Sequence, residues 1–196
     1  YHEHDIKAHK VLTSFSGQKV SVGTHEMTSM PPINIIGQHN RENALLAFAC
    51  AEYLQLEKNS FQKGLQSFSG AGRRQEYLGQ WQGIKIFDDY GHHPTEIQAT
   101  LAAFQETYPK ADIGLVFEPH QYSRTRLFFD DFLSVFSQSH KTALFPIYAA
   151  RDTEADKASV SRSDFLEKNP TLQKVSDTAS TKKFLSQFQP GDIVVF

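Results

Sequence analysis

The alternation of short apolar segments with amphipathic ones constrains the fold of this chain more than any other feature. Apolar runs that predict strands lie at residues 84–87, 113–117, 143–147, 172–175 and 193–196. The run Ile113–Phe117 is apolar throughout, as is typical of parallel strands buried on both faces. Residues with helical spacing separate the runs, and strands that alternate with helices form a doubly wound sheet. The polar residues 152–163 are expected to form a connecting loop.

A polar loop follows the strand predicted for residues 84–87, and it is the first candidate site. Residues 88–93 contain two aspartates, a tyrosine and two histidines. Pro94 suits the first position of a helix, and Glu96 suits the positive end of the helix dipole, so His93 is expected near the N-cap. Open α/β sheets bind ligands outside the carboxyl ends of their strands, where this loop lies. The alternative is a turn whose aspartates only cap and solvate it.

A second polar loop, residues 118–125, follows the strand predicted for residues 113–117 and precedes a helix that begins near Ser123. If the two strands are neighbours in the sheet, the two loops face one crevice. Arg124 could then bind a carboxylate, because its planar guanidinium matches that group. A cation is unfavourable near the start of a helix, which favours a functional role over a surface one.

The first 72 residues carry a weaker pattern. A short buried strand is expected at residues 33–36, a helix from about Asn40 to Leu56, and a second helix from Ser60 to Phe68. Apolar residues with helical spacing on the first helix are Leu46, Ala49, Cys50, Tyr53 and Leu54, and this face is expected to be buried. The small residues 69–72 mark the best domain boundary.

Two asparagines of the first helix have different interpretations. Asn40 is a competent N-cap residue. Asn43 lies one turn further along, where asparagine is a poor helix former. Its amide both donates and accepts hydrogen bonds, which suits the edge of an adenine ring.

Composition excludes several classes of protein. A formal net charge of −2 gives no electrostatic reason to expect a nucleic acid or an anionic membrane as partner. No run approaches the roughly 18 apolar residues of a membrane helix, and no signal peptide is expected. The single cysteine, Cys50, excludes an internal disulfide and fits a reducing compartment, so a cytoplasmic globular protein is expected. His2, His4 and His9 match no closed zinc pattern, so no metal site is expected.

Four motifs together resemble the Mur ligases. They are Gly37-Gln38-His39-Asn40-x-x-Asn43-Ala44-Leu45, Gly72-Arg73-Arg74, Asp88-Asp89-Tyr90-Gly91-His92-His93-Pro94-Thr95-Glu96 and Pro119-His120-x-Tyr122-Ser123-Arg124-Thr125. They occur in the order that the family has and extend over about residues 33–148. The resemblance implies that residues 1–72 end a central α/β ATP-binding domain and that residues 73–196 form a Rossmann-like C-terminal ligase domain.

In this family ATP phosphorylates a substrate carboxylate, an amine attacks the acyl phosphate, and phosphate leaves a tetrahedral intermediate. The closest branch adds L-alanine to UDP-N-acetylmuramate in peptidoglycan synthesis, with ATP and Mg²⁺. The resemblance places His39, Asn40 and Asn43 at the adenine, and Arg74 and Asp89 near the ribose and phosphates. It places Tyr90, His92, His120 and Arg124 around the incoming alanine. The attacking amine must be neutral and an imidazole is a reasonable proton acceptor, so we propose His92 for that role.

The chain also departs from the family. It lacks the Gly-rich phosphate loop that ends in Gly-Lys-Ser/Thr, the domain that binds the UDP-sugar, and the expected metal ligands of the central domain. Gln121 stands where the family usually has arginine. The chain therefore resembles the C-terminal part of a ligase. One alternative is the recycling ligase that adds a ready-made peptide to the same sugar nucleotide; another is a non-catalytic nucleotide- or ligand-binding module.

Overall fold

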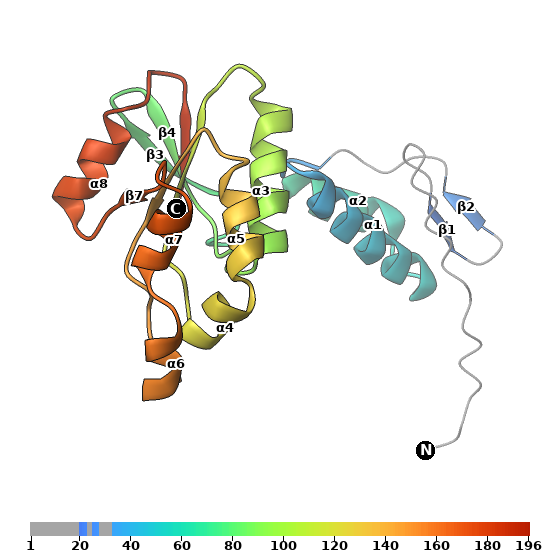
Figure 1. Ribbon diagram of the computed structural model, residues 1–196. Coiled ribbons are helices and arrows are strands. Elements are labelled where there is room, and N and C mark those ends of the chain that lie inside the picture. Colours follow the sequence, from blue (N-terminus) through green and yellow to red (C-terminus); the bar gives the residue numbers. More distant parts are fainter. Residues whose placement is uncertain (1–19, 23–24, 28–32) are drawn as a thin grey trace. The chain divides into compact units, whose positions relative to one another are not determined.

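The computed structural model describes residues 20–22, 25–27 and 33–196 of the chain (Figure 1). It divides into two compact units, Tyr1–Ser69 and Gly70–Phe196. No helix among the described residues is both long enough and apolar enough to cross a membrane. The histidines 2, 4 and 9 lie outside the described residues.

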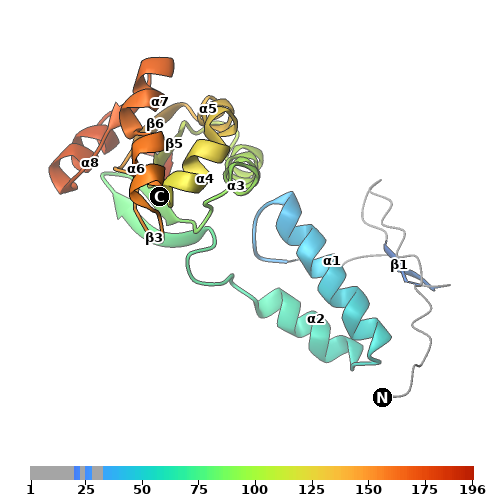
Figure 2. The same ribbon diagram turned by 60° about the horizontal axis from the view of Figure 1, so that its bottom comes forward.

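The first unit contains a hairpin and a helix pair (Figure 2). Strands β1 (Val20–Val22) and β2 (His25–Met27) pair antiparallel, and helices α1 (Gln38–Tyr53) and α2 (Lys58–Ser67) follow. Phe48 of α1 is buried, and its ring centroid lies 5.7 Å from that of Phe61 on α2. Leu45 and Leu65 complete this small core. The two predicted helices are therefore present.

Two local predictions for this unit were wrong. Residues 33–36 are irregular rather than a strand. A strand is held by hydrogen bonds to a neighbouring strand, and no described strand pairs with these residues. Helix α1 begins two residues before Asn40, so Asn40 is not its N-cap. The Asn40 Nδ2 atom instead donates to the carbonyl oxygen of Ile36 at 2.7 Å, one turn back.

The predicted apolar face of α1 was also wrong. Leu46 and Leu54 are 62% and 64% exposed, and Cys50 is exposed too. The buried residues are Ala44, Phe48 and Ala51, because α2 packs on the Phe48 side of the helix. The side chains of residues 49 and 53 lie outside the described part of the structure.

The second unit is built on a six-stranded sheet with the order β3-β4-β8-β5-β6-β7. Its strands are β3 (Glu76–Trp81), β4 (Ile84–Asp88), β5 (Ile113–Phe117), β6 (Lys141–Leu144), β7 (Gln173–Lys174) and β8 (Ile193–Val195). All neighbours pair parallel except β3 and β4, which form an antiparallel hairpin. The predicted doubly wound α/β fold is confirmed.

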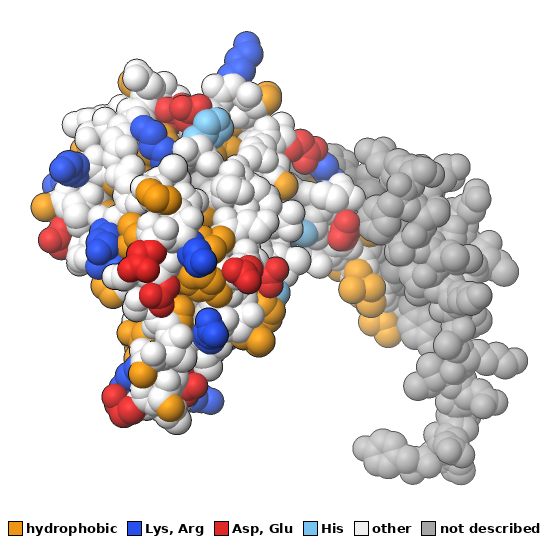
Figure 3. Space-filling model, viewed as in Figure 1, with side chains coloured by type: hydrophobic (Ala, Val, Ile, Leu, Met, Phe, Trp, Pro, Cys, Tyr) orange, Lys and Arg blue, Asp and Glu red, His pale blue; other side chains and the backbone are white. Residues whose placement is uncertain are grey.

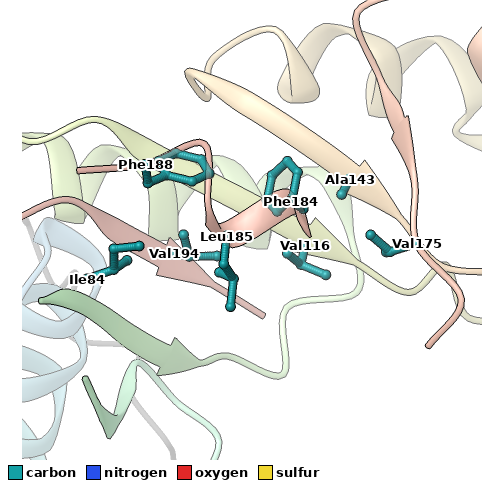
Figure 4. Close-up of a cluster of buried hydrophobic side chains, with 8 residues drawn as sticks. All are labelled: Ile84, Val116, Ala143, Val175, Phe184, Leu185, Phe188 and Val194. Atoms are coloured by element: carbon teal, nitrogen blue, oxygen red, sulfur yellow. The ribbon is translucent and has the colours of Figure 1, made fainter. Parts of the chain in front are cut away.

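Helices cover both faces of this sheet (Figures 1 and 2). They are α3 (Pro94–Thr107), α4 (Tyr122–Leu127), α5 (Phe129–Phe136), α6 (Glu154–Ser159), α7 (Arg162–Lys168) and α8 (Thr178–Leu185). On one face, Phe184 and Leu185 of α8 pack with Val116 and Val194 of the central strands (Figure 4). Successive strand residues point to opposite faces, so Phe117 contacts the other layer, with its ring 5.3 Å from Phe132 of α5.

The returning strand β8 determines how the two polar loops are placed. It inserts between β4 and β5, so these two strands are not neighbours. The last residue, Phe196, donates its N–H to the carbonyl oxygen of Phe87 at 2.9 Å, and its own carbonyl oxygen accepts from the N–H of Asp89 at 2.8 Å. The carboxyl ends of β4, β8 and β5 therefore meet at one edge of the sheet.

The segment 152–163 was wrongly predicted to be a loop. Helix α6 occupies its centre, and α7 begins within it. Each helix starts with a capping box: Thr153 pairs with Asp156, and Ser161 pairs with Asp164. These caps stabilise two short helices whose composition is too polar to give a strong apolar period.

Candidate active site

A cleft of about 560 Å³ lies at the carboxyl ends of β4, β8 and β5. Both polar loops line it. The predicted site residues that it brings together are Asp89, Tyr90, His92, His120 and Arg124, and Gln121 lies among them. On the face of the second unit seen in Figure 3, basic and acidic side chains are mixed rather than gathered by sign. The position matches the rule for ligand sites in open α/β sheets.

Asp89 fastens the first loop. Its Oδ1 atom accepts the N–H of Gly91 at 2.8 Å, and its Oδ2 atom accepts the N–H of Gln75 at 3.0 Å. Burial raises the pKa of Asp89 above its ordinary value, although these two bonds and the charge of Arg74 act in the opposite direction. A Cβ atom at position 91 would come within 2.9 Å of Asp89 Oδ1, so any larger residue there would displace the Asp89 carboxylate.

The start of helix α3 fixes the end of the same loop. His93 is the N-cap, as predicted, and Pro94 follows it. Glu96 completes a capping box, because its Oε2 atom accepts the N–H groups of His92 and His93 at 3.0 and 3.2 Å. Burial tends to raise the pKa of Glu96, but the hydrogen bonds from the N–H groups of His92 and His93 and the nearby His92 and Arg74 side chains outweigh it and lower the pKa.

His92 points one defined nitrogen at the backbone. Its Nδ1 atom lies 3.0 Å from the carbonyl oxygen of Tyr90 and 3.6 Å from Oε2 of Glu96. A carbonyl oxygen only accepts, so Nδ1 of the neutral ring carries the hydrogen. The Nε2 atom then has a free lone pair, and among the described residues it has no hydrogen-bond partner. His92 can therefore accept a proton from a ligand in the cleft.

Two arginines surround the ring of Tyr90. The Cζ atoms of Arg73 and Arg74 lie 5.0 and 5.7 Å from the ring centroid. The Arg73 Nε atom also lies 3.2 Å from Oδ2 of Asp88. Arg73 lines the cleft, whereas Arg74 does not. The role predicted for Arg74, at the ribose and phosphates, stays a prediction.

The second loop contributes an imidazole, an amide and a guanidinium. The Nε2 atom of His120 lies 3.3 Å from Oε2 of Glu118. Gln121 has a φ of 68°, a left-handed conformation that is costly for any residue with a Cβ atom. Arg124 lines the cleft, and no carboxylate in the described part of the chain lies within ion-pair distance of it. Its guanidinium can therefore bind an anion.

Comparison with known proteins identifies the family. Residues 73–196, more than half of the chain, match the family described as Mur ligase, glutamate ligase domain. The chain belongs to the Mur ligase family. This confirms the resemblance carried by the four motifs. The match covers the sheet, the helices that flank it and all the residues that line the cleft.

Two curated relatives of this Mur ligase chain carry the same name. The UDP-N-acetylmuramate–L-alanine ligase of Agathobacter rectalis is 42% identical over 168 residues, which is 83% of this chain and 36% of that protein. The ligase of the same name from Bdellovibrio bacteriovorus is 34% identical over 175 residues, which is 89% of this chain and 39% of that protein. The chain thus spans less than two fifths of the length of these relatives.

Solved structures share the fold of this Mur ligase chain. The UDP-N-acetylmuramate-alanine ligase of Thermotoga maritima superposes with a TM-score of 0.66 at 20% identity, over 91% of this chain and 38% of that one. The bifunctional folylpolyglutamate synthase/dihydrofolate synthase of Yersinia pestis gives 0.65 at 15% identity, over 90% of this chain and 39% of that one. At these identities the likeness shows the α/β fold alone.

The residues predicted to contact adenine belong to the first unit, whereas the cleft lies in the second. His39, Asn40 and Asn43 all lie in the first two turns of α1. Asn43 is exposed and lies four residues after His39, so the two side chains share one face of the helix. Part of the Asn40 amide is engaged with Ile36. Their nucleotide role stays a prediction.

Sequence reasoning missed several residues of the cleft. Arg73, Arg151 and Phe196 line it, and Asp152 supports it by accepting hydrogen bonds from the N–H and hydroxyl of Ser123 at 3.1 and 3.0 Å. Burial tends to raise the pKa of Asp152, but these bonds and others from the backbone lower it. No motif marks Arg151 or Asp152, because they lie in or beside a segment that was predicted to be a loop.

The acidic residues of the cleft do not form a metal site. Asp88 pairs with Arg73, Asp89 binds two backbone N–H groups, and Glu118 contacts His120. Among the described residues, no group of three or more His, Cys, Asp or Glu side chains could hold a metal ion.

Proposed function

We propose that this chain is the C-terminal part of an ATP-dependent, Mg²⁺-requiring ligase that joins L-alanine to UDP-N-acetylmuramate in peptidoglycan synthesis. The observation that carries the proposal is that Arg124 and His92 line the same cleft. Arg124 offers a cation that has no acidic partner among the described residues, and Nε2 of His92 offers a nitrogen lone pair. A free amino acid brings the matching groups, a carboxylate and an amine.

The chemistry assigns each group a task. The carboxylate of UDP-N-acetylmuramate takes the γ-phosphoryl group of ATP, which gives an acyl phosphate and releases ADP. The alanine amine then attacks the carbonyl carbon of the acyl phosphate. A C–N bond forms, the bond to the phosphate oxygen breaks, and phosphate leaves. Arg124 holds the alanine carboxylate, and Nε2 of His92 accepts the proton that the amine loses. Tyr90 and His120 line the same space and complete the alanine site.

The remaining residues are assigned to the nucleotide. His39, Asn40 and Asn43 bind adenine, while Arg74 and Asp89 lie near the ribose and phosphates. On this account residues 1–72 end the central domain and residues 73–196 form the ligase domain. The reaction uses ATP and a sugar nucleotide, both supplied in the cytoplasm, where we place the protein.

The experiment uses the complete protein that contains this chain. With UDP-N-acetylmuramate, ATP and Mg²⁺, phosphate release should depend on added L-alanine, and mass spectrometry should detect the alanyl product. The 196-residue chain alone should release no phosphate above background, because it lacks a phosphate loop. Product from a preformed peptide but not from alanine would favour the recycling ligase. No product from either would leave a binding module.

A further inference from the structure

We propose that Arg151 is a second cationic anchor for the carboxylate of the incoming amino acid. The inference rests on the proposed function and adds to it a residue that no motif marks. Three arginines line the cleft: Arg73, Arg124 and Arg151. Arg73 is occupied by Asp88 and by the ring of Tyr90.

Arg124 and Arg151 are the two cleft arginines that remain for a ligand. No acidic side chain in the described part of the chain forms an ion pair with either of them. The cleft carboxylates are occupied elsewhere, since Glu118 contacts His120 and Asp89 accepts two backbone N–H groups. A monoanion with two oxygens can use two guanidinium groups.

The backbone on both sides of Arg151 is tied to the loop that carries Arg124. Before it, the carbonyl oxygen of Tyr148 accepts the N–H of Gln121 at 2.9 Å, and the N–H of Tyr148 donates to Pro119 at 2.8 Å. After it, Asp152 accepts both hydrogen bonds from Ser123. Arg151 is therefore held beside the second loop rather than on an independent segment.

Gln121 contributes no charge to the cleft. It lines the cleft near the start of α4 but offers only a neutral amide, whose hydrogen bonds are about half as strong as charge-assisted ones. With Arg151 beside Arg124 the cleft offers two cations for one carboxylate. A phosphate group of the nucleotide would be the other anion that fits an arginine, and the test separates the two.

The test compares L-alanine with L-alaninamide, which keeps the amine and lacks the carboxylate, in the complete protein. Arg151→Gln should lower kcat/KM for alanine about tenfold or more, mainly through KM, and change kcat/KM for alaninamide less than about threefold. Arg126→Gln is the matched control, because Arg126 is an exposed arginine of α4 outside the cleft lining. Arg151→Lys should retain part of the preference for alanine.

A second experiment moves the positive charge from position 151 to position 121. Adding Gln121→Arg to Arg151→Gln should restore most of the alanine kcat/KM. An equal loss for alanine and alaninamide, or a raised KM for ATP instead, overturns the inference and leaves a phosphate role. Wild-type protein that does not turn over alanine overturns the proposed function itself. Wild-type turnover with an unchanged alanine preference in Arg151→Gln overturns only this inference.

Discussion

The Nδ1 atom of His92 lies 3.0 Å from the carbonyl oxygen of Tyr90, two residues earlier in the same loop. This contact requires a hydrogen on Nδ1 of the neutral ring, so the lone pair is on Nε2. Asp89 and Glu96 keep the contact in place, because their carboxylates bind backbone N–H groups of the same loop. The loop thus holds a proton acceptor in a defined tautomer on a residue that lines the cleft.

Replacing His92 by glutamine tests that role. In the complete protein His92→Gln should lower kcat roughly 10²-fold or more, because a general base contributes on that scale. His93→Asn is the control, since His93 caps α3 and asparagine is also a good N-cap. An unchanged kcat with a raised alanine KM would make His92 a binding residue.

Gln121 offers a stability test. Its φ of 68° is strained for glutamine and acceptable for glycine, so Gln121→Gly should raise the free energy of unfolding by about 1 kcal/mol. Gln98→Gly, at an exposed interior position of α3, should lower it by about 1 kcal/mol. The fluorescence of Trp81, the single tryptophan, follows denaturant unfolding of the second unit. Destabilisation by Gln121→Gly would show that no strain is relieved.

Glu96 should stabilise the folded chain only while its carboxylate is charged. Its pKa is lowered in the folded chain, so its contribution is present above the ordinary value of 4.5 and is lost as the pH falls through the folded value. Glu96→Gln should cost about 0.5–1 kcal/mol near pH 7, a capping-box loss reduced by solvent screening. The cost should disappear in acid. A cost independent of pH would contradict the charged capping box.

The contribution of Asp89 to the free energy of unfolding should depend on pH in the opposite direction. Burial raises its pKa, so the folded state favours the protonated form, and that contribution is present below the ordinary value of 3.8 and is lost as the pH rises through the folded value. The asparagine side chain of the Asp89→Asn variant cannot ionise. The unfolding free energy of wild type minus that of Asp89→Asn should therefore fall as the pH rises above 3.8. A difference that grows with pH would mean that the hydrogen bonds of Asp89 outweigh its burial.

The local signals in the sequence predicted much of the second unit. Strand Ile113–Phe117 has the predicted bounds, and His93 caps α3 because Pro94 and Glu96 follow it. Such features depend on neighbouring residues, so the sequence alone can indicate them. Both polar loops line one cleft because each directly follows a strand that ends at the same edge of the sheet.

Long-range packing decided the parts that could not be predicted. The insertion of β8 between β4 and β5 depends on pairing with the last residues of the chain. Phe48 rather than Leu46 is buried on α1, because α2 covers that side. Arg151 reaches the cleft through hydrogen bonds of Tyr148 and Asp152, which no periodicity reveals.

The most direct test of the central claim replaces alanine by hydroxylamine, an amine without a carboxylate, in the complete protein. If the cleft binds the incoming amino acid, Arg124→Ala should lower kcat/KM for alanine by a factor that corresponds to about 2–5 kcal/mol of binding free energy, the scale for leaving a charge unpaired. It should leave hydroxamate formation from UDP-N-acetylmuramate, ATP and hydroxylamine within about threefold of wild type, because activation of the sugar carboxylate does not need Arg124. Equal loss of both products would contradict the account and place Arg124 in the phosphorylation step.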